Sequence, residues 1–328
     1  MDSVRINTKP VTMKASVRSK YGKAEVIRIQ EIERPTPKDD ELLIKVHATT
    51  VNRSDYHALT GKPVFMRLMT GLLKPKLPIT GSDFAGQVEA AGRSAKLFKA
   101  GDRVMGFIDL GSQSHAQYLA ISETQVASAP GNVSYEEAAA CLEGAFYAIS
   151  GMSYITPKAG ENALVIGGTG AIGSSYVQFF KSHNLDITAV CRGEHSQLVK
   201  DLGAAKIIDY QKEDFTKVPG QYDYVIDAVG GHSYARCRHL LKKGGAFSSS
   251  GGAMNILVSL LTPRAGGRRV IFPIPRNLIG SLNHIKDLVE GGKFKSVIDR
   301  KYPIEKIAEA YTYVGSGQKV GNVVIVME

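Results

Sequence analysis

Cysteine is scarce in this sequence, and long apolar runs are missing. The three cysteines, Cys141, Cys191 and Cys237, form no CxxC pair, which favours reduced thiols over a disulfide framework. No stretch approaches the roughly 18 uninterrupted apolar residues of a transmembrane helix. The first twelve residues also lack the apolar region of a secretory signal. We therefore expect a cytoplasmic protein without integral membrane contact.

Long runs of one charge are also missing. The 41 basic and 31 acidic residues leave a net charge of +10, which would attract nucleic acid or anionic surfaces if it were concentrated. Instead, Lys and Arg are spread along the chain. This pattern favours an ordinary solvated surface, or an attraction for small molecules that carry phosphate, and we expect no nucleic-acid partner.

The pattern of hydrophobic residues changes once along the 328 residues and predicts two domains. Up to about residue 129, short segments such as ELLIKVHATTV and FAGQVEAAG lie between Gly and Pro, as in a mostly antiparallel, barrel-like β domain. From Ser134 onward, strands and helices alternate, which is typical of a parallel sheet covered on both faces. The final helices and strands return to the first domain. We predict a β domain from residues 1–130 and 276–328, and a second domain from residues 131–275.

The sharpest motif is NALVIGGTGAIGSS, in which Gly168, Gly170 and Gly173 form GxGxxG between a buried strand and a helix. This is the context that a dinucleotide-binding fingerprint requires, because the glycines let backbone N–H groups approach a pyrophosphate at the helix N-terminus. Four further strand–helix units support the interpretation. The motif predicts a Rossmann-type domain in which the cofactor contacts Gly168, Thr169, Gly170, Ala171, Ile172 and Gly173.

The next strand, DITAVC, is followed by Arg192, where NAD-specific sites usually have Asp or Glu for the ribose hydroxyls. A guanidinium can instead pair with the 2′-phosphate of NADP(H), and Ser196 can add a hydroxyl contact. The sequence therefore favours NADP(H) as cofactor. The alternative is a surface arginine that binds no ligand.

Several ordered phrases resemble one family. RPTPKDDELLIKVHATTVNRSD, FKAGDRVMGF, LGAAKIIDY and YDYVIDAVGG resemble the medium-chain dehydrogenase/reductase superfamily. The stretch MRLMTGLLKPKLPITGSDFAGQVEA looks most like its zinc-free, quinone oxidoreductase-like branch. The resemblance implies an α/β fold in which a doubly wound Rossmann sheet is inserted into a chaperonin-10-like β-barrel catalytic domain.

The resemblance also bears on zinc. The zinc-dependent branch has Cys where this chain has Asn52, a His–Glu pair at Ser82 and Asp83, and another ligand near Glu143. Asn and Ser are poor zinc ligands. The four closely spaced cysteines of that branch's structural zinc site are absent as well. We expect no metal.

For catalysis, the family pattern implies Asn52 and Asp55, with Tyr56 as a hydrogen-bond or proton donor. The structural alternative is that Asn52 only caps a turn and that Asp55 only starts the following helix. Tyr210 lies where relatives approach the adenosine phosphate, although a purely structural role stays open. Asp227 ends a strand without a settled role, and Lys200 is expected to be a solvated helix residue.

These features predict a zinc-independent oxidoreductase that uses NADPH to transfer hydride to quinones or α,β-unsaturated carbonyls. A zinc-free alcohol or aldehyde reductase and a non-catalytic NADPH-binding protein are the alternatives. The sequence does not identify the physiological substrate. The segment between Ser250 and Pro273 is expected to border the pocket. A homodimer is expected to form through a sheet edge at RVIF.

Overall fold

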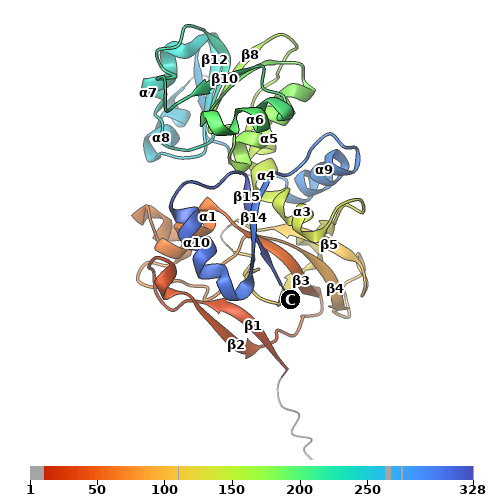
Figure 1. Cartoon of the computed structure of the whole chain (residues 1–328). Coiled ribbons are helices and arrows are strands. Elements are labelled where there is room, and N and C mark those ends of the chain that lie inside the picture. Colours follow the sequence, from red (N-terminus) through yellow and green to blue (C-terminus); the bar gives the residue numbers. More distant parts are fainter. Residues whose placement is uncertain (1–10, 110, 263–266, 275, 328) are drawn as a thin grey trace, which may run out of the picture. The chain divides into compact units, whose positions relative to one another are not determined.

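The computed structural model describes residues 11–109, 111–262, 267–274 and 276–327 (Figure 1). The chain divides into two compact units. The first contains Met1–Ala129, Lys301–Gln318 and Val323–Glu328, and the second contains Pro130–Arg300 and Lys319–Asn322. In the part of the chain that is described, no helix is long and apolar enough to cross a membrane.

The first unit is built on a seven-stranded sheet in which β14, β15, β3, β4, β5 and β7 follow one another and β6 pairs with β3. The pairs of β3 with β15, β4 and β6, and of β5 with β4 and β7, are all antiparallel, as predicted. The sheet strands are β3 (Glu41–Val51), β4 (Asp83–Ala91), β5 (Arg103–Phe107), β6 (Tyr118–Ser122), β7 (Ala127–Ser128), β14 (Ile298–Pro303) and β15 (Asn322–Val326). A separate antiparallel pair is formed by β1 (Thr12–Val17) and β2 (Arg28–Glu33).

Helix α10 (Ile307–Gly315) closes the core of this unit. Ile307, Tyr311 and Val314 recur at helical spacing and are completely buried against residues of β3 such as Leu42 and Ile44. The other helical segments of this unit are α1 (Arg53–Thr60), α2 (Arg67–Thr70), η1 (Ala24–Val26), η2 (Val64–Met66), η3 (Glu123–Gln125) and η6 (Ile304–Lys306).

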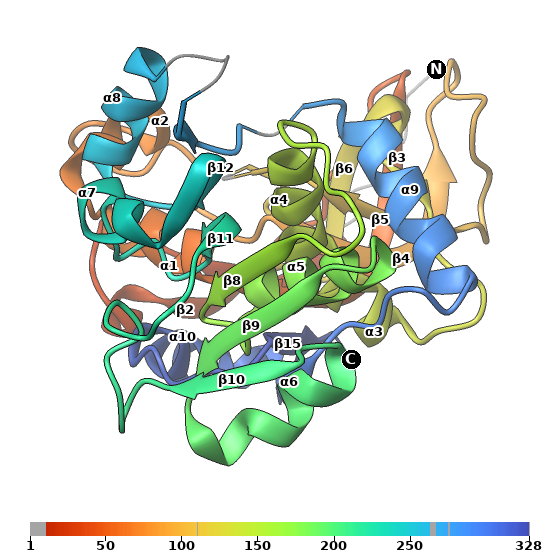
Figure 2. The ribbon, with the colours of Figure 1, turned by 90° about the horizontal axis from the view of Figure 1, so that it is seen from above.

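The second unit contains a six-stranded sheet in the order β10-β9-β8-β11-β12-β13, and each strand is parallel to its neighbours. Figure 2 shows β12, β11, β8, β9 and β10 side by side. The order reverses between β8 and β11, which is the place where open α/β sheets bind ligands. The strands are β8 (Asn162–Ile166), β9 (Asp186–Cys191), β10 (Lys206–Asp209), β11 (Tyr222–Asp227), β12 (Leu241–Ser249) and β13 (Arg269–Ile271).

The helices of the second unit follow these strands or precede the sheet. They are α3 (Tyr135–Ala140), α4 (Leu142–Met152), α5 (Ala171–Ser182), η4 (Gly193–His195), α6 (Ser196–Leu202), α7 (Tyr234–Cys237), η5 (Arg238–Leu240), α8 (Ala253–Leu261) and α9 (Leu278–Glu290). Ser134 caps α3 as expected, because its side chain accepts a hydrogen bond from the Glu137 N–H.

One predicted boundary differs from the structure. We expected residues 276–300 in the β domain, but they belong to the second unit. Helix α9 is amphipathic, and its buried residues, Leu282, Ile285 and Val289, need an apolar partner, which α4 supplies. The Asn132 amide also donates to the Val289 carbonyl at 3.4 Å. The residues of the first unit resume at Lys301.

Candidate active site

The first candidate site is at the start of α1, directly after β3. Asn52 is the N-cap of α1, and the Asp55 Oδ2 atom accepts a hydrogen bond from the Asn52 N–H at 2.8 Å. The Ser82 hydroxyl donates to Asp55 Oδ1 at 3.1 Å. Asp55 therefore stabilises the helix start, as the structural alternative proposed, and its 2% exposed side chain is buried.

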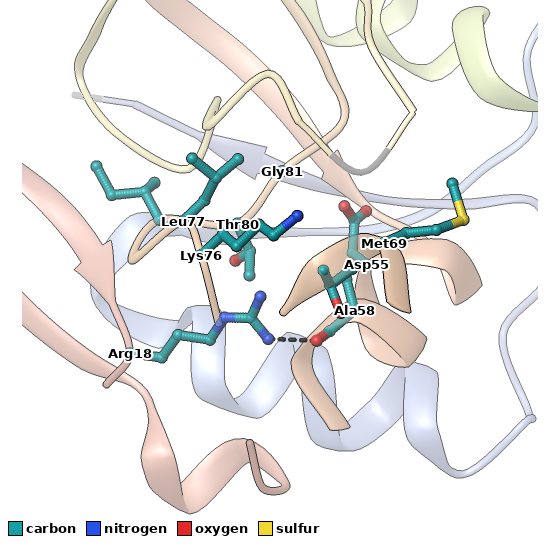
Figure 3. A pocket seen from close by; sticks show the side chains of 10 residues that line it. Arg18, Asp55, Ala58, Met69, Lys76, Leu77, Thr80 and Gly81 are labelled. Atoms are coloured by element: carbon teal, nitrogen blue, oxygen red, sulfur yellow. Dashed lines mark hydrogen bonds between the residues drawn. The ribbon is translucent and has the colours of Figure 1, made fainter. Parts of the chain in front are cut away.

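Asp55 also lines a cavity of about 230 Å³ that lies entirely within the first unit (Figure 3). The wall is mostly apolar, with one acidic and two basic side chains. Its lining residues are Arg18, Asp55, Ala58, Met69, Thr70, Lys76, Leu77, Ile79, Thr80 and Gly81. A cavity of this kind suits a small ligand with a carbon skeleton and a few polar atoms.

Burial controls the protonation of Asp55. Loss of hydration and, to a smaller extent, the nearby Asp83 carboxylate raise the pKa of this carboxyl, while the hydrogen bonds from Asn52 and Ser82 lower it; the result is a pKa of about 8. At neutral pH the Asp55 side chain therefore carries a proton at the cavity wall. The sequence pattern did not indicate that Asp55 would be protonated or that its pKa would be raised.

Arg18 faces Asp55 across the cavity, as Figure 3 shows. One of its terminal nitrogens donates a hydrogen bond to the Ala58 carbonyl near the C-terminal end of α1. The Nε–H is buried and has no partner among the described residues. Burial lowers the pKa of the guanidinium below its ordinary value. Arg18 thus supplies a buried cation with a spare donor, and no sequence motif indicated it.

A chain of hydrogen bonds fixes the polar end of the cavity. The Tyr311 hydroxyl donates to Thr80 Oγ1 at 2.8 Å, and Thr80 in turn donates to His115 Nδ1 at 2.9 Å. His115 donates from Nε2 to the Thr50 carbonyl at 2.9 Å. Burial lowers the pKa of His115 to about 4, so this ring is neutral and its two nitrogens have fixed roles.

Asn52 belongs to the same polar cluster but does not line the cavity. Its amide nitrogen donates to Thr50 Oγ1 at 2.5 Å and to Asp83 Oδ2 at 3.2 Å. Its Oδ1 atom is buried without a partner among the described residues. Thr50 also binds Asp83, through its N–H at 2.8 Å and its hydroxyl at 2.7 Å. These bonds hold Asn52 and Asp83 in fixed positions beside Asp55.

Tyr56, the third residue implied for catalysis, is not brought to the cavity. Its half-buried ring packs in the apolar core, where a Cβ added to Gly315 of α10 would meet the ring within 3.0 Å. Since successive helix positions point about 100° apart, Asp55 and Tyr56 face different neighbours. Two other phenols bond to lining residues, each at 2.8 Å: the Tyr311 hydroxyl to Thr80 and the Tyr21 hydroxyl to Thr70.

The second candidate site is the glycine loop of the second unit. A Cβ on Gly173 would collide with the Gly167 carbonyl, and a Cβ on Gly168 would meet that of Ala189 at 3.0 Å. Gly170 is the N-cap of α5 and has no side chain to cap it, and the first turn carries no acid. The uncapped N–H groups and the helix dipole favour an anion here, so the loop fits a pyrophosphate.

Arg192 and Tyr210 come together at the ends of neighbouring strands β9 and β10. The Arg192 Nε donates to the Tyr210 hydroxyl at 2.9 Å. The Ser196 hydroxyl donates to the Gly193 carbonyl at 2.6 Å and retains its acceptor capacity. Glu194, which no sequence motif indicated, has a carboxylate that lies 3.5 Å from Arg192 and 3.4 Å from His195. The guanidinium is therefore already opposed by an acid.

Two residues with unsettled roles now have structural ones. Asp227 is completely buried and accepts hydrogen bonds from the Gly230 and His232 N–H groups and from the Ser249 hydroxyl. It organises the loop after β11. Lys200 is exposed on α6, as expected. Of the segment expected to border the pocket, residues 263–266 lie outside the described part of the chain, and its helix α8 exposes Leu257, Leu260 and Leu261.

At the positions where the zinc-dependent branch has its ligands, Asn52 and Ser82 are held by hydrogen bonds to carboxylates. Glu143 is buried in α4 of the second unit. Among the described residues, no group of three or more His, Cys, Asp or Glu side chains is placed to hold a metal ion.

A parallel sheet with a glycine loop at its order reversal, together with an antiparallel unit that buries a carboxyl in a cavity, defines a dinucleotide-dependent oxidoreductase. Family models agree: residues 38–150 match the alcohol dehydrogenase GroES-like domain, and residues 202–325 match a domain described as zinc-binding dehydrogenase.

The chain is 32% identical over 329 residues to 2-methylene-furan-3-one reductase of Solanum lycopersicum, covering 96% of this chain and 79% of that protein. It is 30% identical to NADPH-dependent alkenal/one oxidoreductase, chloroplastic, of Arabidopsis thaliana, covering 96% and 80%. The quinone oxidoreductase of Coxiella burnetii has the same fold, with a TM-score of 0.85 at 24% identity over 97% of this chain and 100% of that one. The chain belongs to the quinone oxidoreductase-like branch of the medium-chain dehydrogenase/reductase superfamily. The predicted fold class is confirmed.

Proposed function

We propose that this oxidoreductase uses NADPH, without zinc, to reduce quinones or α,β-unsaturated carbonyls. The observation that carries the proposal is the apolar cavity of the first unit, with the protonated Asp55 and the cationic Arg18 at its wall. Two relatives, 32% and 30% identical to this chain, are named as a 2-methylene-furan-3-one reductase and an alkenal/one oxidoreductase. Both names denote reduction of unsaturated carbonyl compounds.

The residues of the cavity suit such a substrate. Reduction of an enone or a quinone needs one hydride, which bound NADPH would supply, and one proton. Asp55 holds a proton on its carboxyl at neutral pH and can deliver it at the cavity wall. The Arg18 guanidinium stabilises the negative charge that develops on the substrate oxygen. The apolar side chains of Met69, Leu77 and Ile79 contact the carbon skeleton and exclude water.

The preference for NADPH rests on Arg192 and Tyr210. A phosphate can replace Glu194 as the partner of the guanidinium and gain a second hydrogen bond from the Tyr210 hydroxyl. Glu194 is the one observation that opposes this assignment, since it repels a 2′-phosphate. Because the Glu194 side chain is 62% exposed, it is free to turn into solvent when the phosphate arrives.

Independence from zinc rests on the chemistry of the donors. Asn52 and Ser82 offer a neutral amide and a hydroxyl, and both already bind carboxylates. Buried Asp55 and Arg18 provide the proton and the positive charge that a metal-bound site would otherwise supply.

The test is NADPH oxidation by the purified chain with a benzoquinone, a linear enone and a saturated ketone, each also measured with NADH. Turnover of the quinone or the enone well above that of the ketone supports the proposal. Preference for the ketone would support the alcohol or aldehyde reductase alternative. NADPH binding without turnover of any substrate would support a non-catalytic binding protein.

The cytoplasm is our proposal for the compartment, supported by three buried cysteines that are all free. Because the Arabidopsis thaliana relative is named as chloroplastic, imaging of a tagged chain in its native cell is the measurement that distinguishes the two locations.

A further inference from the structure

Residues 62–77 of the first unit present an apolar surface to solvent. The segment contains η2, the short helix α2 and the turn that follows (Figure 2). Five of its side chains are between 65% and 95% exposed: Val64, Leu68, Met69, Leu72 and Leu73. Single exposed apolar residues are ordinary on a protein surface, but five within ten positions indicate a surface that binds a partner.

The backbone under this surface is firmly attached. The Tyr21 hydroxyl donates to the Gly71 carbonyl at 2.6 Å and bonds to Thr70 Oγ1 at 2.8 Å. The Arg67 guanidinium lies over the Tyr21 ring at 4.7 Å, and the Lys76 N–H returns to the Thr70 carbonyl at 2.8 Å. The exposed side chains are therefore held on a fixed base, so binding would not first have to order the chain.

The charge of the segment is of one sign. From Tyr56 to Ser82 the sequence contains no Asp or Glu, while four cations occur within it: Lys62, Arg67, Lys74 and Lys76. None of the four forms an ion pair with a carboxylate of the described residues. Lys62, Lys74 and Lys76 are exposed. The apolar side chains thus lie among positive charges that form no ion pair within the described part of the chain.

We propose that residues 62–77 dock the protein on the surface of a bilayer that contains anionic lipids. Exposed Leu and Met side chains can enter the boundary between headgroups and acyl chains, while neighbouring Lys and Arg bind lipid phosphates and carboxylates. A second copy of the chain is a poorer occupant, because a twofold interface would bring four cations against the same four. An uncharged apolar partner would leave these cations without counterions.

The experiment is co-sedimentation of the full chain with vesicles of phosphatidylcholine alone or mixed with phosphatidylserine, at low and high salt. We expect partitioning into the phosphatidylserine vesicles that is on the order of tenfold stronger and that weakens in high salt. The double variant Leu72→Ser/Leu73→Ser should lose on the order of tenfold of this binding, since both apolar side chains are removed. Lys74→Glu should weaken binding to the phosphatidylserine vesicles and leave binding to the phosphatidylcholine vesicles unchanged, because only the former carry anionic lipid.

The matched control is Leu260→Ser/Leu261→Ser on α8, where the two leucines are 78% and 75% exposed. It removes two exposed leucine side chains from the second unit and should leave partitioning into the vesicles unchanged. Neither Leu72 nor Leu73 lines the cavity, so reduction of a water-soluble enone should continue in Leu72→Ser/Leu73→Ser. Equal binding to both vesicle types, no binding, or an equal loss in the α8 control would overturn the proposal. A self-association that only Leu72→Ser/Leu73→Ser abolishes would identify a second copy as the occupant instead.

Discussion

The backbone N–H of Asn52 donates a hydrogen bond to the carboxyl group of Asp55 at 2.8 Å, and the same carboxyl lines the cavity of the first unit. The structural and the catalytic interpretations of Asp55 are therefore compatible, because one carboxyl oxygen can cap the helix start while the group as a whole carries a proton. A test of catalysis has to preserve the cap. Asparagine does so, since its side-chain oxygen accepts the same hydrogen bond.

We expect Asp55→Asn to lower kcat by about 100-fold or more, because the amide cannot deliver a proton to the substrate. In the unaltered enzyme the rate should fall as pH rises through about 8, where Asp55 loses its proton. The variant should keep its low residual rate across this range. Steady-state pH profiles with an enone check both points. Ser82→Ala is the control, because it removes a bond to Asp55 without removing the acid. An unchanged alkaline limb in Asp55→Asn would remove Asp55 from the mechanism.

The same carboxyl makes stability depend on pH. Its folded pKa of about 8 lies above the unfolded value of about 4, so the folded state binds the extra proton. The free energy of unfolding should therefore be highest below about pH 4 as far as this group is concerned, and should decrease as pH rises towards 8. Urea unfolding at several pH values should show this decrease. The slope should be smaller in Asp55→Asn, and an identical slope would contradict the raised pKa.

Arg192→Glu should reverse the preference for NADPH. Two acids would then face a 2′-phosphate where one cation stands now, a change worth on the order of 1–3 kcal/mol. Glu194→Gln should act in the opposite sense and strengthen NADPH binding, because it removes the acid that lies 3.5 Å from the guanidinium. Fluorescence titration of both cofactors measures the ratio. If neither variant changes the ratio of NADPH to NADH affinity, the 2′-phosphate does not bind at Arg192 and Tyr210.

Gly173→Ala should destabilise the glycine loop by about 1–3 kcal/mol and abolish NADPH binding, because the new Cβ would collide with the Gly167 backbone. Gly170→Ala is the matched control for folding: its Cβ meets nothing nearer than 3.5 Å, and its φ of −72° suits any residue. It should keep the melting temperature of the unaltered chain and lose only cofactor affinity. Equal melting temperatures for all three proteins would show that the loop adapts to Gly173→Ala.

Activity should survive prolonged chelation, and purified protein should hold no stoichiometric zinc. The reason is that Asn52 and Ser82 offer poor ligands and are committed to hydrogen bonds with carboxylates. Elemental analysis combined with an assay after chelation provides the measurement. One zinc per chain, with activity that disappears on its removal, would refute this prediction.

The sequence predicted the parts of the molecule that depend on local pattern. The glycine loop, the parallel strands and the antiparallel β unit follow from alternation, helical spacing and the positions of glycine, all of which act within a few residues. Local pattern is not sufficient at YARCRHLLKK, where the apolar spacing favours one helix but the helical segments α7 and η5 end at Leu240. Leu241 instead begins β12, because it pairs with Tyr222 of β11 and is completely buried there. Tertiary pairing overrode the helical spacing.

The cavity was not predictable in the same way. Arg18, His115 and Tyr311 are far apart in the sequence and meet only because the antiparallel sheet and α10 bring them together. None of them has a motif. The raised pKa of Asp55 depends on burial and on Asp83, which likewise are properties of the fold. Tyr56 does not line this cavity, because its ring points from α1 into the apolar core.

Assembly gives the last prediction. The strand expected at a sheet edge is β13, and it does form the edge of the six-stranded sheet next to β12. Pairing with the β13 edge of a second copy around a twofold axis would satisfy its exposed backbone groups. Light scattering should therefore report about twice the chain mass of 35.4 kDa. Hydrogen exchange of the amides of β13 should slow as protein concentration rises.

The obvious variant, Val270→Lys, does not test this assembly. Val270 is only 5% exposed and packs in the core of the second unit, so a lysine there would place a charge among apolar side chains and unfold the unit. The dependence of exchange on concentration avoids this problem, because it compares the same chain with itself. A mass of one chain, together with exchange in β13 that does not change with concentration, would establish a monomer.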